Sequence, residues 1–526
     1  MILDGNNLTA EQVNGIAQDP EIQIEITSDT ESHVTASRKL LERFVAEKRV
    51  IYGVNTACGG FVHWLVPIEK ASEMQQNLLG ATASNVGDYL ADNYVRAIIA
   101  TRINSLARGA SAISLENFKK YIAIFNAGIL PCIPEKGSLG ASGDLGPLAY
   151  IGLVATGHWK AKLGGKIVSG KEALQQSGIE PMTLSYKEGL AMINGTSAMT
   201  GMAACLTSQI KDLIKSYLIV SSMSVEALKG KIMPFHEAAH ENKPHPGQIK
   251  VAKCIFSTLQ DSKMVVHDEE IEEMLRKLQT DEPMGMDEQI EDAYSIRATP
   301  QILGPVVDTT LFVESTIQIE LNSTSDNPLV LPSRGDVFHN ANFHGQYISN
   351  AMDQISIALT TMCNLSDRRT DRFLDPANSN GLKPFLCDKN PGLSYGLMGG
   401  QYLATSLVAE IRSLCTPVSI QTLTSTGDFQ DHVSFGLVAA RRTRDILKNA
   451  YYVLGFELIC ACQAADLRGA EKLGTITSKA FNIVREKIPF RDNDDPLTPY
   501  IEMAAQLLET GRLLEALPQT DNDYTW

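Results

Sequence analysis

Three long stretches of the chain carry apolar residues at intervals of three and four positions, the spacing that places them on one face of a helix. These stretches cover residues 197–229, 345–373 and 435–467, and the first of them contains no proline. Each is longer than the usual helix of a globular protein. We therefore predict a mainly α fold, in which long helices form a bundle and bury their apolar faces against each other or against another subunit.

Shorter patterns complete the predicted elements. Helices are expected at residues 31–50, 89–107 and 267–277, a hairpin around Gly164–Gly165, and weak strands near residues 329–337. The Gly- and Pro-rich region at residues 128–146 cannot form one regular element. We expect two domains: an N-terminal domain at residues 1–200, and a central helical bundle with a C-terminal helical region at residues 201–526.

Composition narrows the function classes. The chain has 526 residues, of which 44% are hydrophobic and 20% charged, close to the average of globular proteins. The net charge is −15 and no basic run stands out, so the electrostatic footprint of a nucleic-acid binder is missing. The nine scattered cysteines include no CxxC pair, which favours free thiols in a reducing compartment. No signal-peptide pattern or long uncharged apolar window is visible, so we expect a cytoplasmic protein with no membrane partner.

One short motif suggests a metal. The segment HEAAH matches the HExxH pattern, in which His236 and His240 share a helix face and can bind zinc, with Glu237 as general base. However, Pro234 and Pro244 bracket the motif and leave little room for a helix that presents both imidazoles. A zinc hydrolase is therefore the alternative from another class, and we expect no metal.

The segment PCIPEKGSLGASGDLGPLAY at residues 131–150 has three interpretations. It can be a structural Gly-rich loop or a phosphate cradle, although GxxxxGK[ST] is absent. The third interpretation is chemical: the amide nitrogen of Gly143 can attack the carbonyl of Ala141, and loss of water closes a five-membered ring. Loss of the Ser142 hydroxyl as a second water leaves an exocyclic methylene. The product is 4-methylideneimidazole-5-one (MIO), a strong electrophile of a kind that no ordinary side chain supplies.

Several separated motifs carry a resemblance over residues from about 31 to 490. They are IYGVNT (51–56), GSLGASGDLGPL (137–148), INGTSAM (193–199), AYSIRATPQ (293–301), ELNSTSDNPL (320–329), FHNANFHGQ (338–346) and GDFQD (427–431). With these motifs the chain resembles the aromatic amino acid ammonia-lyases and 2,3-aminomutases, with histidine ammonia-lyase as a relative. The resemblance implies a long-helix bundle of the histidine and phenylalanine ammonia-lyase (aspartase-like) superfamily. It also implies a homotetramer, with each active site built from loops of three subunits, and MIO formed from Ala141, Ser142 and Gly143.

The same resemblance implies roles for individual residues. Tyr52, on a Gly-rich loop that we expect to be a mobile lid, is the base that removes a β-hydrogen. A phenol is a poor base at its ordinary pKa near 10, so the resemblance also implies an electropositive site that lowers the pKa of Tyr52. Arg297 anchors the substrate carboxylate through its planar guanidinium, and Tyr294 faces the same site one helical turn earlier. Asn194 binds the prosthetic group or the substrate amine. Further residues implied at the substrate are Gly59, Leu78, Thr82, Phe343, Tyr395, Tyr402, Phe429 and Gln430.

The substrate side chain is less sharply indicated. The nearest resemblance is to bacterial phenylalanine and tyrosine 2,3-aminomutases of natural-product (antibiotic) pathways. The hydroxyls of Thr82, Tyr395 and Tyr402 near one pocket end favour a substrate with a para-hydroxyl, because unpaired buried polar groups are costly. Phe429 favours phenylalanine instead. We expect conversion of L-tyrosine to β-tyrosine, with a phenylalanine 2,3-aminomutase, or an ammonia-lyase on either amino acid, as the alternative.

Overall fold

The computed structural model describes residues 1–277, 283, 290–518 and 522–524. The chain packs into two compact units. Unit 1 contains Met1–Ser208, Val313–Asp353 and Pro417–Thr443, and unit 2 contains Gln209–Phe312, Gln354–Thr416 and Arg444–Trp526. The expected division into residues 1–200 and 201–526 does not describe these units, because two later segments return to unit 1. Four of the five boundaries between the units fall inside long helices, and the fifth, between Thr416 and Pro417, lies after the helix Met398–Leu414.

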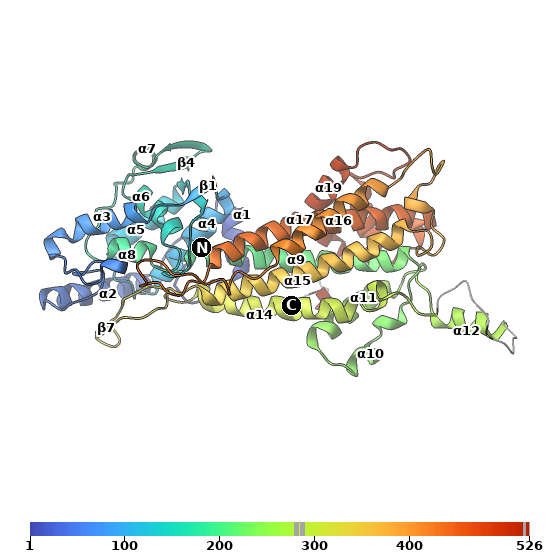
Figure 1. Ribbon diagram of the computed structural model, residues 1–526, viewed down its shortest axis with the longest axis horizontal. Coiled ribbons are helices and arrows are strands. Elements are labelled where there is room, and N and C mark those ends of the chain that lie inside the picture. Colours follow the sequence, from blue (N-terminus) through green and yellow to red (C-terminus); the bar gives the residue numbers. More distant parts are fainter. Residues whose placement is uncertain (278–282, 284–289, 519–521, 525–526) are drawn as a thin grey trace. The chain divides into compact units, whose positions relative to one another are not determined.

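The three long helical patterns correspond to three long helices. These are α9 (Ser197–Ala227), α15 (Gln346–Leu374) and α17 (Gly436–Arg468) (Figure 1). A fourth long helix, α14 (Thr299–Leu321), contains Pro305 and was not expected. Among the described residues, α17 alone is long and apolar enough to cross a membrane, but 83% of its most apolar window is buried inside the protein. It therefore packs as a core helix.

Within unit 2, parts of α9, α15 and α17 pack against each other around a buried ion pair. The Nε of Arg369 lies 2.5 Å from Oε1 of Glu457, and both side chains are fully buried. Ser224 and Ser366 donate hydrogen bonds to the two oxygens of Glu457, at 2.7 and 2.5 Å. The α-helices that lie wholly in unit 2 are α10 (Glu237–Glu241), α11 (Pro246–Leu259), α12 (Asp268–Lys277), α13 (Tyr294–Arg297), α16 (Met398–Leu414), α18 (Thr475–Arg485) and α19 (Thr498–Glu509).

Unit 1 is built around α4 (Asp92–Ala107), whose residues from Tyr94 to Ala107 are all buried. The helix expected at residues 89–107 is therefore confirmed. Because α4 is buried on all sides, its apolar residues are not confined to one face. The other α-helices that lie wholly in unit 1 are α1 (Ala10–Gln18), α2 (Ser28–Ala46), α3 (Ala71–Thr82), α5 (Leu115–Asn126), α6 (Leu145–Ala155), α7 (Gly170–Gln176) and α8 (Glu188–Ile193).

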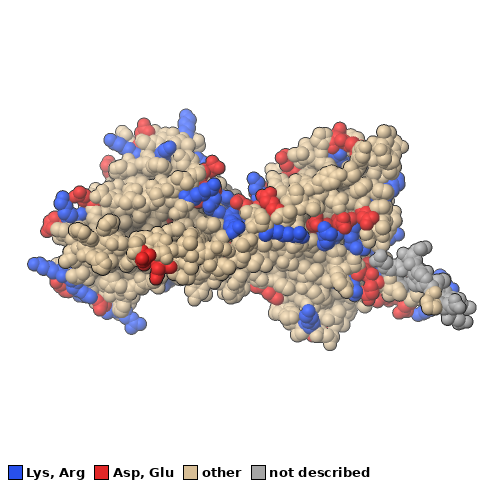
Figure 2. All heavy atoms as spheres, in the orientation of Figure 1, with Lys and Arg blue, Asp and Glu red and all other residues tan. Residues whose placement is uncertain are grey.

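The strands of unit 1 are short and antiparallel. The expected hairpin at Gly164–Gly165 is confirmed by β4 (Lys160–Leu163) and β5 (Lys166–Ser169), and the weak signals near residue 330 by β6 (Leu329–Leu331) and β7 (Asp336–Phe338). The remaining strands are β1 (Val86–Tyr89), β2 (Leu130–Pro131) and β3 (Pro134–Lys136). On the face shown in Figure 2, basic and acidic side chains are interspersed.

Candidate active site

The Ala141-Ser142-Gly143 tripeptide lies in unit 1, in the loop that leads into α6. Gly143 has φ of +68°, and a Cβ atom there would overlap the carbonyl group of Gly195. The next residue, Asp144, donates its backbone N–H to the same Gly195 oxygen at 2.7 Å. Only glycine fits this close approach of two backbone segments, and the loop is held in a bent conformation.

Asp144 anchors this loop from inside the protein. Its carboxylate accepts hydrogen bonds from the hydroxyl of Ser138 and from the backbone N–H of Met199, each at 2.7 Å. Burial raises the pKa of Asp144 to about 6, and the hydrogen bonds of Met199 and Ser138 oppose this rise. The carboxyl group therefore connects the loop to the start of α9.

Both oxygens of Ser142 accept hydrogen bonds from amide side chains. Gln430 donates its Nε2–H to the Ser142 hydroxyl at 2.8 Å, and Asn194 donates its Nδ2–H to the Ser142 carbonyl at 3.2 Å. The first oxygen is the one that must leave as water when MIO forms, and the second would become the ring carbonyl. The two amide donors, and the bent backbone at Gly143 where no side chain blocks the amide nitrogen, are the surroundings that the MIO group requires.

Tyr52 lies in unit 1 on the loop before α3, and its hydroxyl is held by the same loop. The backbone N–H of Gly59 donates to the Tyr52 oxygen at 2.8 Å. Burial raises the pKa of Tyr52 to about 12, the neighbouring Cys58 adds to the rise, and the Gly59 hydrogen bond opposes it. The expectation of a lowered pKa is therefore not met within one chain, because burial outweighs the single N–H donor.

This pKa gives a pH prediction. The resemblance assigns Tyr52 the role of the base, and a phenol acts as a base in its phenolate form. With a pKa of about 12, the phenolate fraction of Tyr52 increases as the pH rises through the neutral and alkaline range. We expect kcat to rise with pH between about 7 and 9, by up to about tenfold per unit, and Tyr52→Phe to abolish that rise. The check is a pH–rate profile of both proteins, with the melting temperature measured at each pH. A wild-type rate that falls over this interval in a folded protein would contradict the assignment.

Leu78 and Thr82 lie on the last turns of α3. Leu78 lines a cavity of about 520 Å³ together with Cys58 and Phe61 of the tyrosine loop. The hydroxyl of Thr82 donates to the carbonyl of Leu78 at 2.8 Å and also lies 3.3 Å from the carbonyl of Leu79. The helix carbonyl takes the hydroxyl proton of Thr82, so this hydroxyl can meet a substrate para-hydroxyl only as an acceptor.

Phe343 and Phe429 also belong to unit 1. The loop that contains Phe343 is tied to the tripeptide loop, because Gly345 donates its N–H to the carbonyl of Gly140 at 3.1 Å. Phe429 precedes Gln430 and is 50% exposed. Tyr52, Ser142, Asn194, Gln430 and their surroundings are thus held by the same compact unit.

The remaining candidate residues lie in unit 2 and are open to solvent in the single chain. The exposed fractions of Tyr294, Tyr395 and Tyr402 are 72%, 57% and 65%. The guanidinium of Arg297 lies 5.1 Å from the ring centre of Tyr294 and forms an ion pair of 2.6 Å with Glu291.

The HEAAH segment forms the short helix α10, and His240 is already bound on both sides. Its Nε2 lies 2.9 Å from the carbonyl of Pro234, and its Nδ1 lies 3.0 Å from the amide nitrogen of Gln248. Among the described residues there is no group of three or more His, Cys, Asp or Glu side chains that could hold a metal ion. His240 is thus a buried structural histidine whose partners come from the protein.

Sequence reasoning did not single out two residues of this site. Asp144 stands inside the GSLGASGDLGPL motif, directly after the tripeptide, and that position was a usable signal. Cys58 gives no signal in the sequence, because a cysteine without a second ligand is typical of packing. Its closeness to the Tyr52 hydroxyl depends on how the loop folds.

The family comparison agrees with this geometry. Residues 8–486 match the family model described as aromatic amino acid lyase. The chain belongs to this family. The resemblance inferred from the motifs is thereby confirmed, and so is the mainly α fold, since the solved structures that it resembles include histidine and phenylalanine ammonia-lyases and aminomutases.

Individual relatives of the family differ in substrate and reaction. The phenylalanine aminomutase of Pantoea agglomerans is 52% identical, with a TM-score of 0.95, over 97% of this chain and 98% of that one. The tyrosine ammonia-lyase of Cupriavidus metallidurans is 40% identical over 98% of this chain and 97% of the relative. The MIO-dependent tyrosine 2,3-aminomutase of Streptomyces globisporus is 38% identical over 98% and 96%. Several histidine ammonia-lyases match at 36–38% identity.

Proposed function

We propose that this chain is an MIO-dependent aromatic amino acid 2,3-aminomutase, with L-phenylalanine as its first candidate substrate. The observation that carries the proposal is the pair of amide donors, from Gln430 and Asn194, on the two oxygens of Ser142. Beside them, Gly143 leaves no room for a side chain. The chain also belongs to a family of ammonia-lyases and aminomutases, and this geometry suits their chemistry.

Each residue has a defined task in this proposal. MIO, once formed from the tripeptide, supplies an electrophilic carbon for the amine of the substrate. Asn194 holds the Ser142 carbonyl, where its N–H stabilises negative charge. Tyr52 takes the proton from the β-carbon, and Arg297 binds the α-carboxylate in a site completed by other subunits of a homotetramer. We place the enzyme in the cytoplasm, in a natural-product pathway that uses β-amino acids.

The substrate proposal rests on two observations. The aminomutase that is 52% identical to this chain acts, by its name, on phenylalanine, whereas the tyrosine-directed relatives above are 38–40% identical. In addition, the Thr82 hydroxyl already donates within α3. L-Tyrosine, favoured by the sequence pattern, becomes the second candidate, and the hydroxyls of Tyr395 and Tyr402 are the feature that supports it.

A substitution at Thr82 tests this choice. Thr82→Val keeps the shape of the side chain and removes the hydroxyl, which donates to the carbonyl of Leu78. We expect the ratio of kcat/KM for L-phenylalanine to that for L-tyrosine to change by less than about threefold, well below the cost of losing a substrate hydrogen bond. Leu78→Ala, on the same helix, serves as a control that should weaken both substrates. A selective loss of tyrosine turnover in Thr82→Val would show that this hydroxyl recognises the para-hydroxyl.

The function itself is tested by steady-state kinetics. Purified enzyme is given L-phenylalanine, L-tyrosine and L-histidine separately, and ammonia and arylacrylate are measured in parallel with β-amino acid. We expect the highest kcat/KM for L-phenylalanine and the lowest for L-histidine. A preference for L-histidine would contradict the proposal, and a preference for L-tyrosine would reinstate the second candidate.

A further inference from the structure

Lys187 and Asp326 form an ion pair that is sealed inside unit 1. The Nζ of Lys187 lies 2.7 Å from Oδ2 of Asp326, and the exposed fraction of both side chains is 0%. Lys187 also has a left-handed backbone, with φ of +71°, at the residue before α8. A buried ion pair is weak at stabilising a fold relative to apolar side chains, and a left-handed lysine costs further free energy. If Lys187 serves to hold Asp326 in one place, the buried ion pair and the left-handed backbone of Lys187 have a common reason.

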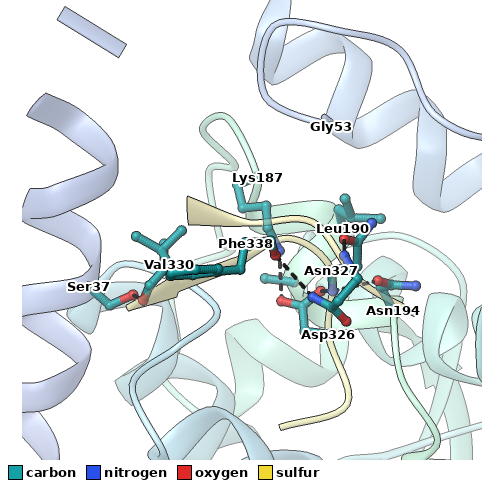
Figure 3. A network of polar contacts seen from close by, with 12 residues as sticks. Ser37, Gly53, Lys187, Leu190, Asn194, Asp326, Asn327, Val330 and Phe338 are labelled. Carbon is teal, nitrogen blue, oxygen red and sulfur yellow. Dashed lines mark hydrogen bonds and ion pairs between the residues drawn. The ribbon is translucent and has the colours of Figure 1, made fainter. Parts of the chain in front are cut away.

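The pair leads directly to the candidate active site. The second oxygen of Asp326, Oδ1, accepts the backbone N–H of Asn327 at 2.7 Å. The same N–H lies 2.9 Å from Oδ1 of Asn194. Figure 3 shows these side chains grouped together, with Lys187 and Asp326 turned toward each other and Asn194 beside Asn327. The Asn327 N–H therefore sits between the carboxylate and the Asn194 amide.

This N–H decides which way the Asn194 amide points. An N–H donor needs an acceptor, so the oxygen of the amide turns toward Asn327 and the NH₂ group turns away from it. In that orientation the NH₂ group of Asn194 donates to the Ser142 carbonyl at 3.2 Å. Without a fixed Asn327, the amide would lose the contact that selects this orientation.

A second buried cation faces the same carboxylate. Arg102 is fully buried, and its Nε and Nη1 have no hydrogen-bond partner among the residues that the structure describes. Burial lowers the pKa of Arg102, and the charge of Asp326 opposes this effect. A Cβ atom at Gly195, the residue after Asn194, would overlap the Arg102 guanidinium. Asp326 thus compensates two cations, both close to the segment that carries Asn194.

We propose that Lys187 and Asp326 are positioning residues for the reaction: Lys187 fixes Asp326, Asp326 fixes the Asn327 N–H, and this N–H orients Asn194 toward the Ser142 carbonyl. The inference rests on the proposed function, because it assigns the oriented amide to the prosthetic-group carbonyl. Neither residue touches the tripeptide itself. They act through Asn194, and their removal should affect both maturation of the tripeptide and turnover.

The test uses full-length Lys187→Met, Asp326→Asn and the double variant that carries both changes. Lys187→Met leaves the Asp326 carboxylate facing the buried Arg102, so it is the variant expected to fold if those that remove the carboxylate do not. Maturation is followed by intact mass, as the loss of two waters from the chain. We expect slower maturation in the variants, and a fall in kcat per matured site of about 10- to 100-fold with little change in KM, the usual cost of losing a group that orients a contacting residue.

Two controls separate positioning from general stability. In an Asn194→Ala background, the Lys187 and Asp326 changes should have no further effect on kcat, because their target is gone. Arg369→Met with Glu457→Gln removes the fully buried ion pair of unit 2 and should lower the melting temperature without changing kcat per matured site. A folded double variant with wild-type maturation and kcat would overturn the inference alone. A wild-type protein whose intact mass equals that of the encoded chain, with no loss of water, would overturn the proposed function and this inference with it.

Discussion

Replacing Ser142 with alanine is expected to abolish turnover of every aromatic amino acid. Alanine has no hydroxyl to lose, so the exocyclic methylene cannot form, and Gln430 loses the oxygen to which it now donates at 2.8 Å. We expect kcat to fall by at least about 10³-fold, the scale on which removal of a central catalytic group acts. The fold should persist, because Ser142 is only partly buried and its replacement removes a single atom.

The measurement combines initial rates with intact mass. Wild-type protein should be lighter than its encoded chain by two waters, whereas Ser142→Ala should not show the full loss. Ser333→Ala, at an exposed position in the turn between β6 and β7, serves as the matched control and should keep wild-type mass loss and turnover. A Ser142→Ala protein with full turnover would exclude an electrophile built from this tripeptide.

Replacing Tyr52 with phenylalanine should give the second largest loss. The change removes only the hydroxyl that accepts the Gly59 N–H at 2.8 Å, and leaves the ring in place. General base catalysis contributes about 10² to 10⁴-fold, so we expect kcat to fall within that range. KM should change little, because the carboxylate of the substrate is assigned to Arg297.

Intact mass shows whether a loss of turnover in Tyr52→Phe comes from the missing base or from failure of the tripeptide to form MIO. Tyr52→Phe should lose two waters as the wild type does, since the tyrosine has no part in ring closure. Tyr89→Phe, on the exposed strand β1, is the matched control for loss of a phenol and should retain full turnover. If Tyr52→Phe matures fully and still turns over at the wild-type rate, another group must take the β-proton.

The long helices were predictable from the sequence because their apolar residues recur at helical spacing over many turns. α9, α15 and α17 agree with the predicted stretches within a few residues. α14 was not expected, because Pro300 and Pro305 argue against a helix at its start. Both prolines lie in the first two turns of α14, where the first of them replaces an N–H that has no intrahelical partner.

The chemistry of the site was predictable where it is encoded by adjacent residues. Ala141, Ser142 and Gly143 are consecutive, so their ring-forming capacity can be recognised without a fold. The Lys187–Asp326 pair joins residues 139 positions apart, and no local pattern relates them. The pKa of Tyr52 was likewise beyond the sequence, because it depends on how deeply the loop buries the phenol.

The central claim is that the amine moves from the α- to the β-carbon of L-phenylalanine on one enzyme. The most direct test supplies L-phenylalanine labelled with ¹⁵N at the amine, in buffer containing an excess of unlabelled ammonium, and resolves the products by chiral chromatography with mass detection. The account predicts β-phenylalanine that retains ¹⁵N, formed in excess over cinnamate. Cinnamate with stoichiometric ammonia, or β-phenylalanine that carries the unlabelled amine of the buffer, would contradict it and identify an ammonia-lyase.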